Sequence, residues 1–179
     1  MNLNIIPSGK NIPENIYVII EISSNSTPIK YEVDKKTGVL FVDRFISTPM
    51  FYPCNYGYIN KTESQDGDPL DALVPSPHPI LPGSVILCRP IGLLKMIDES
   101  GEDNKVIAVP EKKISNIYTD IKNINDLSKT LKSEIVHFFS HYKDLEPKKW
   151  VKNIEWCDYK AAKKEILSCL KRKKEILSI

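Results

Sequence analysis

Residues 84–109 read SVILCRPIGLLKMIDESGEDNKVIAV and contain three short runs rich in apolar and β-branched residues, at 84–89, 91–97 and 105–109. Each run is typical of a β-strand, and the turn residues Ser100 and Gly101 separate the second run from the third. No helical period lies between the runs. They therefore predict neighbouring strands joined by short turns, not a strand–helix–strand unit.

The residues before this stretch continue the same pattern. Residues 17–22, 29–34, 39–43 and 70–74 predict further strands, and the second and third of these form a hairpin across Lys35-Lys36-Thr37-Gly38. Residues 51–58 bring four aromatic side chains together with Pro, Asn and Gly, and we expect a rigid loop that presents phenolic hydroxyls. Many short strands with no intervening helix predict a small antiparallel barrel.

After Pro110 the hydrophobic period becomes helical. One helix is predicted from Leu127, Leu131, Ile135, Phe138, Phe139, Tyr142 and Leu145, with Asn125, Asp126 or Ser128 as N-cap. A second is predicted from Tyr159, Ala162, Ile166, Leu167 and Leu170, behind a possible cap at Asp158. We expect both helices to pack on the barrel and residues 1–179 to form one domain.

Composition is that of an ordinary soluble protein: 41% hydrophobic, 27% charged, with a net charge of +2. The charge divides into −4 for residues 1–110 and +6 for residues 111–179, counted from the sequence. No signal peptide or membrane span is evident. The four cysteines show no C-x-x-C spacing, which predicts reduced thiols in a cytoplasmic protein.

The chemistry concentrates in Asp66-Gly67-Asp68-Pro69-Leu70-Asp71, which places three carboxylates within six residues. Two like charges about 4 Å apart repel by roughly 4 kcal/mol at an effective dielectric of 20. Such carboxylates must splay into solvent, share protons or hold cations. A solvated turn is the simplest alternative, although the rigid Pro69 argues against it. An EF-hand calcium loop is excluded because its twelfth position, counted from Asp66, is Pro77.

A second acidic cluster, Asp98, Glu99, Glu102 and Asp103, lies at a predicted strand-to-strand turn. Alone, such a cluster is most often a solvated hairpin tip. Together the two clusters would supply the oxygen ligands that Mg2+ prefers, and Mg2+ bound in this way usually works with a phosphate group. Lys30, Arg44 and an unusual carboxylate in an apolar strand, Glu21, are further candidates for the same site.

These motifs closely resemble the family I inorganic pyrophosphatases of the soluble bacterial type. The resemblance covers about residues 10–157 and is carried by Pro28-Ile29-Lys30-Tyr31-Glu32, Val42-Asp43-Arg44-Phe45, Tyr52-Pro53-Cys54-Asn55-Tyr56-Gly57-Tyr58, the Asp66–Asp71 motif and His141-Tyr142-Lys143-Asp144-Leu145. It implies a mainly β (α+β) fold, a five-stranded closed barrel of the oligonucleotide-binding type with two main flanking helices. It also implies Mg2+-dependent hydrolysis of pyrophosphate to two phosphates.

The resemblance implies a role for each matching position. Metal ligands would be Asp66, Asp71, Asp103, Asp98 and Glu32, with Glu21 acting on metals through water. Asp68 matches the general base. Lys30, Arg44, Tyr56, Lys105, Tyr142 and Lys143 match groups that bind phosphate oxygens, with Tyr52 and Glu99 close to the site. A water bound between cations is a far better nucleophile than free water, because its pKa falls toward about 7.

Two rival functions remain open. A non-enzymatic barrel binding single-stranded nucleic acid would use the basic back half, although acids would then line the binding surface. The other rival is a Mg2+-dependent hydrolase of a larger phosphoanhydride such as a nucleotide, but the sequence shows no evident base-stacking slot and no G-x-x-x-x-G-K-[ST] loop. We expect neither nucleic acid nor membrane as partner.

Two features outside the predicted site also carry expectations. His137 and His141 share a helix face, and the resemblance implies that this helix makes subunit contacts in a homo-oligomer, a hexamer, that weaken as imidazoles protonate near pH 6. The basic stretch Lys171-Arg172-Lys173-Lys174 is expected to be a solvated helix end. Removing the chain from Lys171 onward would then leave catalysis intact.

Overall fold

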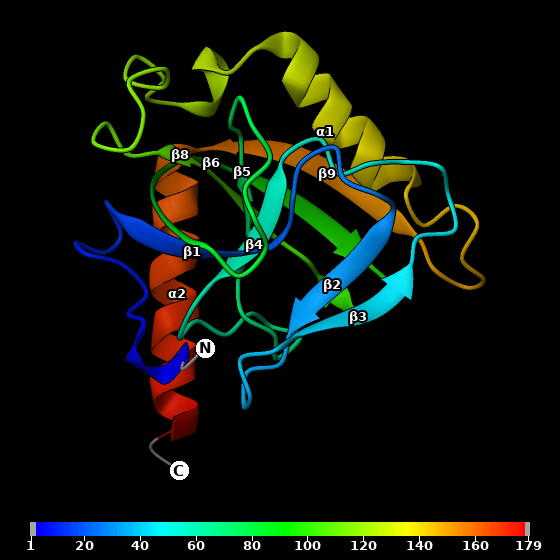
Figure 1. The fold of residues 1–179 in the computed structure, drawn as a ribbon, viewed down its shortest axis with the longest axis horizontal. Helices are drawn as coiled ribbons and strands as arrows, with labels where there is room; N and C mark the ends of the chain where they lie inside the picture. The colour runs from blue at the N-terminus through cyan, green and yellow to red at the C-terminus, as the bar shows by residue number, and fades with distance from the viewer. Residues whose placement is uncertain (1–2, 178–179) are drawn as a thin grey trace.

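A closed ring of five strands forms the centre of the computed structural model, which describes residues 3–177 (Figure 1). In order around the ring these are β1 (Ile16–Ile22), β4 (Asn55–Ile59), β5 (Asp71–Val74), β8 (Lys105–Pro110) and β6 (Val85–Asp98). β1 pairs with both β4 and β6, which closes the ring. The prediction of a five-stranded closed barrel is therefore confirmed.

One pairing in the ring is parallel, so the prediction of a wholly antiparallel barrel is wrong at this position. β5 and β8 run in the same direction, with Asp71 opposite Lys105 and Ala72 opposite Val106. The reason is that β6 crosses the barrel before β8 returns beside β5, so two reversals of direction separate β5 from β8. This pairing puts an acid of the first cluster next to the lysine that follows the second.

β6 is one continuous strand of 14 residues, whereas the sequence predicted two strands broken at Pro90. Pro90 is accommodated because the β6–β8 register shifts between Pro90 and Gly92. The strand continues past Leu94, the last residue that pairs with β8, and pairs with β7 (Gly101–Glu102) at its end. β9 (Val151–Asp158) pairs with β6 from Gly92 to Asp98. Neither β7 nor β9 was predicted, because β9 carries no clear alternation of apolar residues.

The segment predicted as a rigid loop is in part a buried strand. Asn55–Ile59 forms β4, in which every residue is buried. Gly57 explains the position, since a Cβ there would lie 1.9 Å from the carbonyl oxygen of Ile19 in β1. Because glycine has no Cβ, it allows β1 and β4 to approach more closely than any other residue would at this position.

A separate hairpin of β2 (Ile29–Val33) and β3 (Leu40–Phe45) stands beside the open end of the ring (Figure 1). The predicted turn is confirmed: Gly38 adopts a φ of +70°, and the Asp34 carboxylate accepts a hydrogen bond of 2.7 Å from the backbone N–H of Thr37. The hairpin carries Lys30, Glu32 and Arg44 toward the ring.

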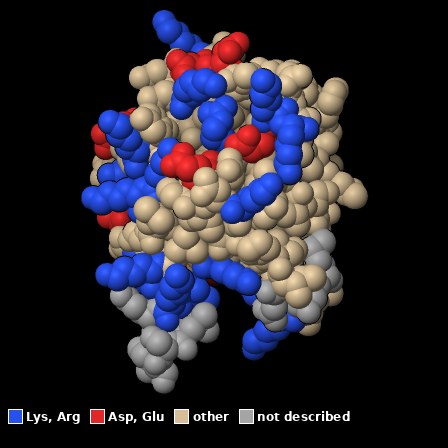
Figure 2. Space-filling model, turned by 90° about the vertical axis from the view of Figure 1, so that its left-hand side faces the viewer, with Lys and Arg blue, Asp and Glu red and all other residues tan. Residues whose placement is uncertain are grey.

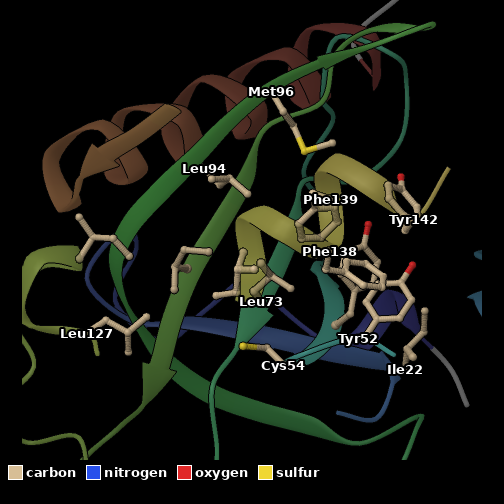
Figure 3. Packing of buried hydrophobic residues seen from close by; sticks show 14 of the residues in the cluster. Ile22, Tyr52, Cys54, Leu73, Leu94, Met96, Leu127, Phe138, Phe139 and Tyr142 are labelled. Atoms are coloured by element: carbon tan, nitrogen blue, oxygen red, sulfur yellow. The ribbon is translucent and has the colours of Figure 1, made fainter. Parts of the chain in front are cut away.

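The first helix, α1 (Lys129–His141), begins at the predicted cap Ser128, whose hydroxyl accepts from the N–H of Leu131 at 3.1 Å. Short 3-10 turns also occur at Leu3–Ile5 and Ile124–Asp126. Figure 3 shows side chains of α1 and of Tyr142 after it pointing toward Tyr52, and the Tyr52 and Phe138 ring centroids lie 4.5 Å apart. This contact fixes the C-terminal end of α1 over the barrel opening.

The second helix, α2 (Tyr159–Leu177), packs along the opposite side of the barrel (Figure 1). Its buried side chains, Ala162, Ile166 and Cys169, join a core with residues of β1, β5, β6 and β8. The predicted cap is confirmed, since the Asp158 carboxylate accepts from the N–H of Ala161 at 2.9 Å. In residues 3–177, no helix is long and apolar enough to cross a bilayer.

Candidate active site

A polar cavity of about 220 Å³ lies between the ring opening, the β2–β3 hairpin and the end of α1. All of the side chains predicted for the site line it: Glu21, Lys30, Glu32, Arg44, Tyr52, Tyr56, Asp66, Asp68, Asp71, Asp98, Glu99, Asp103, Lys105, Tyr142 and Lys143. The volume lies below the usual range for drug-sized ligands, so the cavity suits a small molecule. Tertiary structure thus brings together residues spread over 123 positions of the chain.

The loop Asp66–Asp71 contributes three carboxylates to one wall of the cavity. Gly67 adopts a φ of +91°, which lets the chain reverse so that the Asp66 carboxylate accepts a 3.0 Å bond from the N–H of Asp68. Partial burial raises the pKa of Asp66, and the nearby carboxylates of Asp68, Asp103 and Asp71 raise it further. The loop therefore holds negative charge close to more negative charge, an arrangement that favours a bound cation.

Lys105 lies at the centre of the site and is only 2% exposed. Its Nζ donates to the carboxylates of Asp71 at 2.7 Å and Asp103 at 2.8 Å, and lies 3.4 Å from the Tyr56 hydroxyl. Burial disfavours the charged lysine, but the charges of Asp103 and Asp71 outweigh it and hold the Lys105 pKa well above its ordinary value. The ammonium is thus charged and fully enclosed.

Lys143 makes a second cationic centre on the opposite wall. Its Nζ contacts the carboxylates of Asp98 at 2.8 Å and Glu99 at 3.0 Å. Burial would raise the pKa of Asp98, but the bonds from Lys143 and the backbone of Ser100 outweigh it, so this pKa is lowered. Asp98 therefore stays ionised beside the lysine.

The β2–β3 hairpin supplies the remaining predicted cations. Lys30 pairs with Glu32 and lies 3.4 Å from Asp43, while Arg44 donates to Asp43 at 2.6 Å and to Glu146 at 3.1 Å. Every predicted substrate cation therefore has a carboxylate partner in this structure. An incoming anion would have to compete with those carboxylates for them.

Three tyrosines close the inner wall of the cavity. Tyr52, Tyr56 and Tyr142 are each 6% exposed or less, and the hydroxyl of Tyr56 donates to the Asp71 carboxylate. Burial raises the pKa of all three phenols. They remain neutral hydrogen-bond donors at physiological pH.

Comparison with known proteins gives a consistent answer. The family model described as inorganic pyrophosphatase matches residues 18–174. The inorganic pyrophosphatase of Wigglesworthia glossinidia brevipalpis is 66% identical over 177 residues, covering 98% of this chain and 99% of that one. That of Escherichia coli K12 is 61% identical over 174 residues, covering 97% and 99%.

The fold agrees as well. The crystal structure of the Thermus thermophilus inorganic pyrophosphatase superposes with a TM-score of 0.91 at 43% identity, covering 97% of this chain and 99% of that one. The chain belongs to the inorganic pyrophosphatase family. It is therefore a hydrolase, and the resemblance stated from the motifs is confirmed.

Two cationic residues of the candidate site were not predicted from sequence: Lys35 and Lys149 also line the cavity. Lys35 was assigned only to the hairpin turn, but its Nζ lies 3.8 Å from the centre of the Tyr58 ring and 3.3 Å from the Glu21 carboxylate. Lys149 pairs with Glu146 at 3.0 Å, which also holds Arg44. The sequence pointed to these two lysines only by their position, since each lies a few residues from a predicted site residue.

The carboxylates that line the cavity are of the kind that a hard divalent cation prefers as ligands. The cavity is lined by eight carboxylates and six cationic side chains, with no histidine or cysteine among them. Among the described residues, no three candidate ligands converge on one point. The Lys105 ammonium between Asp71 and Asp103 accounts for part of this, because it occupies the space between two of the predicted ligands.

The burial of Glu21 is expected to make the stability of the protein depend on pH. Burial raises the Glu21 pKa from 4.5 to about 7, against the opposing effect of Lys35. Between these values the folded protein binds a proton that the unfolded chain has lost, so stability falls as pH rises from about 4.5 to 7. In metal-free protein we expect Glu21→Gln to match the wild type at pH 4.5 and exceed its free energy of unfolding by about 3 kcal/mol at pH 8.

Urea unfolding with a chelator present, at both pH values, measures this difference. Glu155→Gln, at an exposed position of β9, serves as control and should shift stability little at either pH. A Glu21→Gln difference that does not change with pH would contradict the assignment.

Proposed function

We propose that this chain hydrolyses inorganic pyrophosphate to two phosphates, with Mg2+ as cofactor and Asp68 as general base. The proposal is supported chiefly by one observation: carboxylates and cations line the same small cavity in nearly equal number. The carboxylates would repel a polyanion that bound without metal, and the lysines would repel a metal ion that bound without an anion. A metal-bound diphosphate satisfies both groups.

The residues proposed to hold Mg2+ are Asp66, Asp71, Asp103, Asp98 and Glu32, with Glu21 acting through water. Bound there, Mg2+ would lower the pKa of a coordinated water and offset charge on the phosphates. Engagement of these carboxylates would also remove both carboxylate partners of Lys105 and one partner each of Lys143 and Lys30, which would keep Glu99 and Asp43. Their charge would then be available to phosphate oxygens.

Asp68 is the carboxylate best placed to accept a proton from the attacking water. It is exposed to the cavity, and its only hydrogen bonds in the described part of the chain use backbone atoms. Lys30, Arg44, Tyr56, Lys105, Tyr142 and Lys143 would orient the substrate and stabilise the charge that develops on the leaving phosphate. Tyr52 and Glu99 support the phenols and Lys143.

A single assay tests the reaction and its substrate. With Mg2+ present we expect phosphate release from pyrophosphate and none from ATP, and addition of a chelator should abolish it. A hydrolase of larger phosphoanhydrides would release phosphate from ATP, and a binding protein would release none from either. Phosphate measured against Mg2+ concentration gives the metal dependence directly.

The surface supports an enzyme better than a nucleic-acid-binding protein. On the face shown in Figure 2, lysine and arginine side chains are spread among acidic and neutral ones and form no continuous basic band. Nucleic-acid binding draws on basic residues that track a phosphate backbone. On this face, acidic and neutral side chains therefore interrupt the positive charge.

We further propose a homohexamer in the cytoplasm. The location is supported by the four cysteines, which are all free thiols, because a reducing compartment keeps thiols from forming disulfides. The oligomer is supported by the exposed pair of rings on α1, with His137 and His141 centroids 4.8 Å apart beside Trp156. Sedimentation at pH 7.5 should show a species of about six times 20.4 kDa. A monomer alone would refute the assembly.

A further inference from the structure

The acidic loop of the site is held together mainly at its base. The Thr62 hydroxyl accepts from the N–H of Leu70 at 2.9 Å, and the N–H of Ser64 donates to the carbonyl of Asp68 at 2.7 Å. Residues 65–68 between these bonds are all exposed. The position of the carboxylates of Asp66 and Asp68 therefore depends on where Glu63 and Ser64 are held.

Helix α2 holds those two residues from a position more than 100 residues later in the chain. The N–H of Glu63 donates to the carbonyl of Cys169 at 3.1 Å, and the guanidinium of Arg172 donates to the carbonyl of Glu63. The Nζ of Lys173 pairs with the Glu63 carboxylate at 2.7 Å. All three kinds of polar group on Glu63 are therefore bound by one turn of α2.

This contact is enclosed on the Glu63 side, whereas the Lys173 side chain is 36% exposed. Glu63 is 9% exposed, Cys169 is fully buried, and the Ser64 hydroxyl lies 3.9 Å from the Cys169 sulfur, which is itself 3.6 Å from the Arg172 guanidinium. Removing the cations would leave the buried Glu63 carboxylate and carbonyl without partners, which costs more than the loss of a surface ion pair. Arg172 and Lys173 are thus not part of a solvated helix end, contrary to the expectation from sequence.

We propose that Arg172 and Lys173 are positioning residues that hold the Asp66–Asp71 loop in its working geometry. Neither residue lines the cavity, so neither is expected to touch substrate. They act through Glu63, which lies three residues before the acidic loop begins at Asp66. The proposal rests on the proposed function, in which those carboxylates hold Mg2+ and accept a proton. A loop free to splay would lose both roles together, since small misplacements of reacting groups reduce rates steeply.

The test compares the double variant Arg172→Ala/Lys173→Ala with the matched control Lys164→Ala, an exposed lysine on the same helix. In the double variant we expect hydrogen exchange of residues 62–71 to accelerate about tenfold. By calorimetry, Mg2+ affinity should fall about fivefold, and kcat should fall about tenfold with a smaller change in KM. The control should leave all three unchanged.

A second experiment exchanges the charges of Glu63 and Lys173, and it tests the proposal even if the double variant fails to fold. Glu63→Lys alone should reproduce the faster exchange, and Glu63→Lys combined with Lys173→Glu should restore much of the protection and of the Mg2+ affinity. Loss of thermal stability with unchanged loop exchange and Mg2+ affinity would overturn the proposal. A wild-type protein without pyrophosphate hydrolysis would refute the function, while the exchange data would still decide the positioning.

Discussion

Replacing Asp68 by asparagine should reduce turnover at least about 10²-fold, the usual lower scale of general acid–base catalysis. Asparagine keeps the size and backbone bonds of Asp68 but cannot accept the proton. The Asp68 side chain is exposed, and within the described residues the hydrogen bonds of Asp68 use only its backbone atoms. The substitution should therefore cost little stability. Phosphate release at saturating Mg2+ and pyrophosphate, with thermal unfolding in parallel, measures both effects.

The matched control is Asp120→Asn, an exposed aspartate in a turn outside the cavity, which should leave turnover unchanged. If Asp68→Asn retains near-normal turnover, the proton acceptor is another group. An equal loss in both variants would point to a general effect of charge, not to proton transfer.

Replacing Lys105 by methionine should give the largest loss of stability of the variants considered. Methionine fills the same volume but leaves Asp71 and Asp103 without the ammonium that now lies within 2.8 Å of both. Breaking an enclosed ion pair typically costs about 3 kcal/mol, because the remaining charges stay poorly solvated. We expect a loss of that size at pH 8 in urea unfolding without metal, together with a steep loss of turnover.

The sign of the pH and metal effects separates this explanation from a simple packing defect. Burial raises the pKa of Asp103, and Lys105 is the main group that opposes this rise. Without Lys105 the folded protein should hold a proton on Asp103 more readily than the unfolded chain does, so the deficit should shrink as pH falls. Mg2+ should stabilise Lys105→Met more than the wild type, because a cation would again lie between the acids. Lys95→Met, at an exposed position of β6, should show neither effect. A deficit independent of both pH and Mg2+ would leave packing as the cause.

Local patterns in the sequence were enough to predict the parts of the fold that local interactions determine. The β2–β3 hairpin depends on a turn in which Asp34 bonds to Thr37 and Gly38 takes a positive φ. The start of α1 depends on the Ser128 cap. In each case the stabilising contact joins residues within four positions, so the residues themselves carry the information.

Strand assignment failed where contacts distant in sequence decide the outcome. Gly57 belongs to a strand because β1 passes against it, and Pro90 is tolerated because β8 shifts register beside it. The parallel pairing of β5 with β8 likewise depends on the path of β6. None of these is visible in a window of a few residues, since the partner strand lies elsewhere in the chain.

The sequence by itself determined the family and which residues line the cavity, because the Asp66–Asp71 motif and its matching lysines and tyrosines are distinctive enough to indicate a family. Only the tertiary structure decided how those charges are compensated. It buries Lys105 between two acids, adds Lys35 to the cavity, and ties the acidic loop through Glu63 to the far end of α2. The physical reason is that charge compensation depends on distance and burial in space, and neither is encoded in separation along the chain.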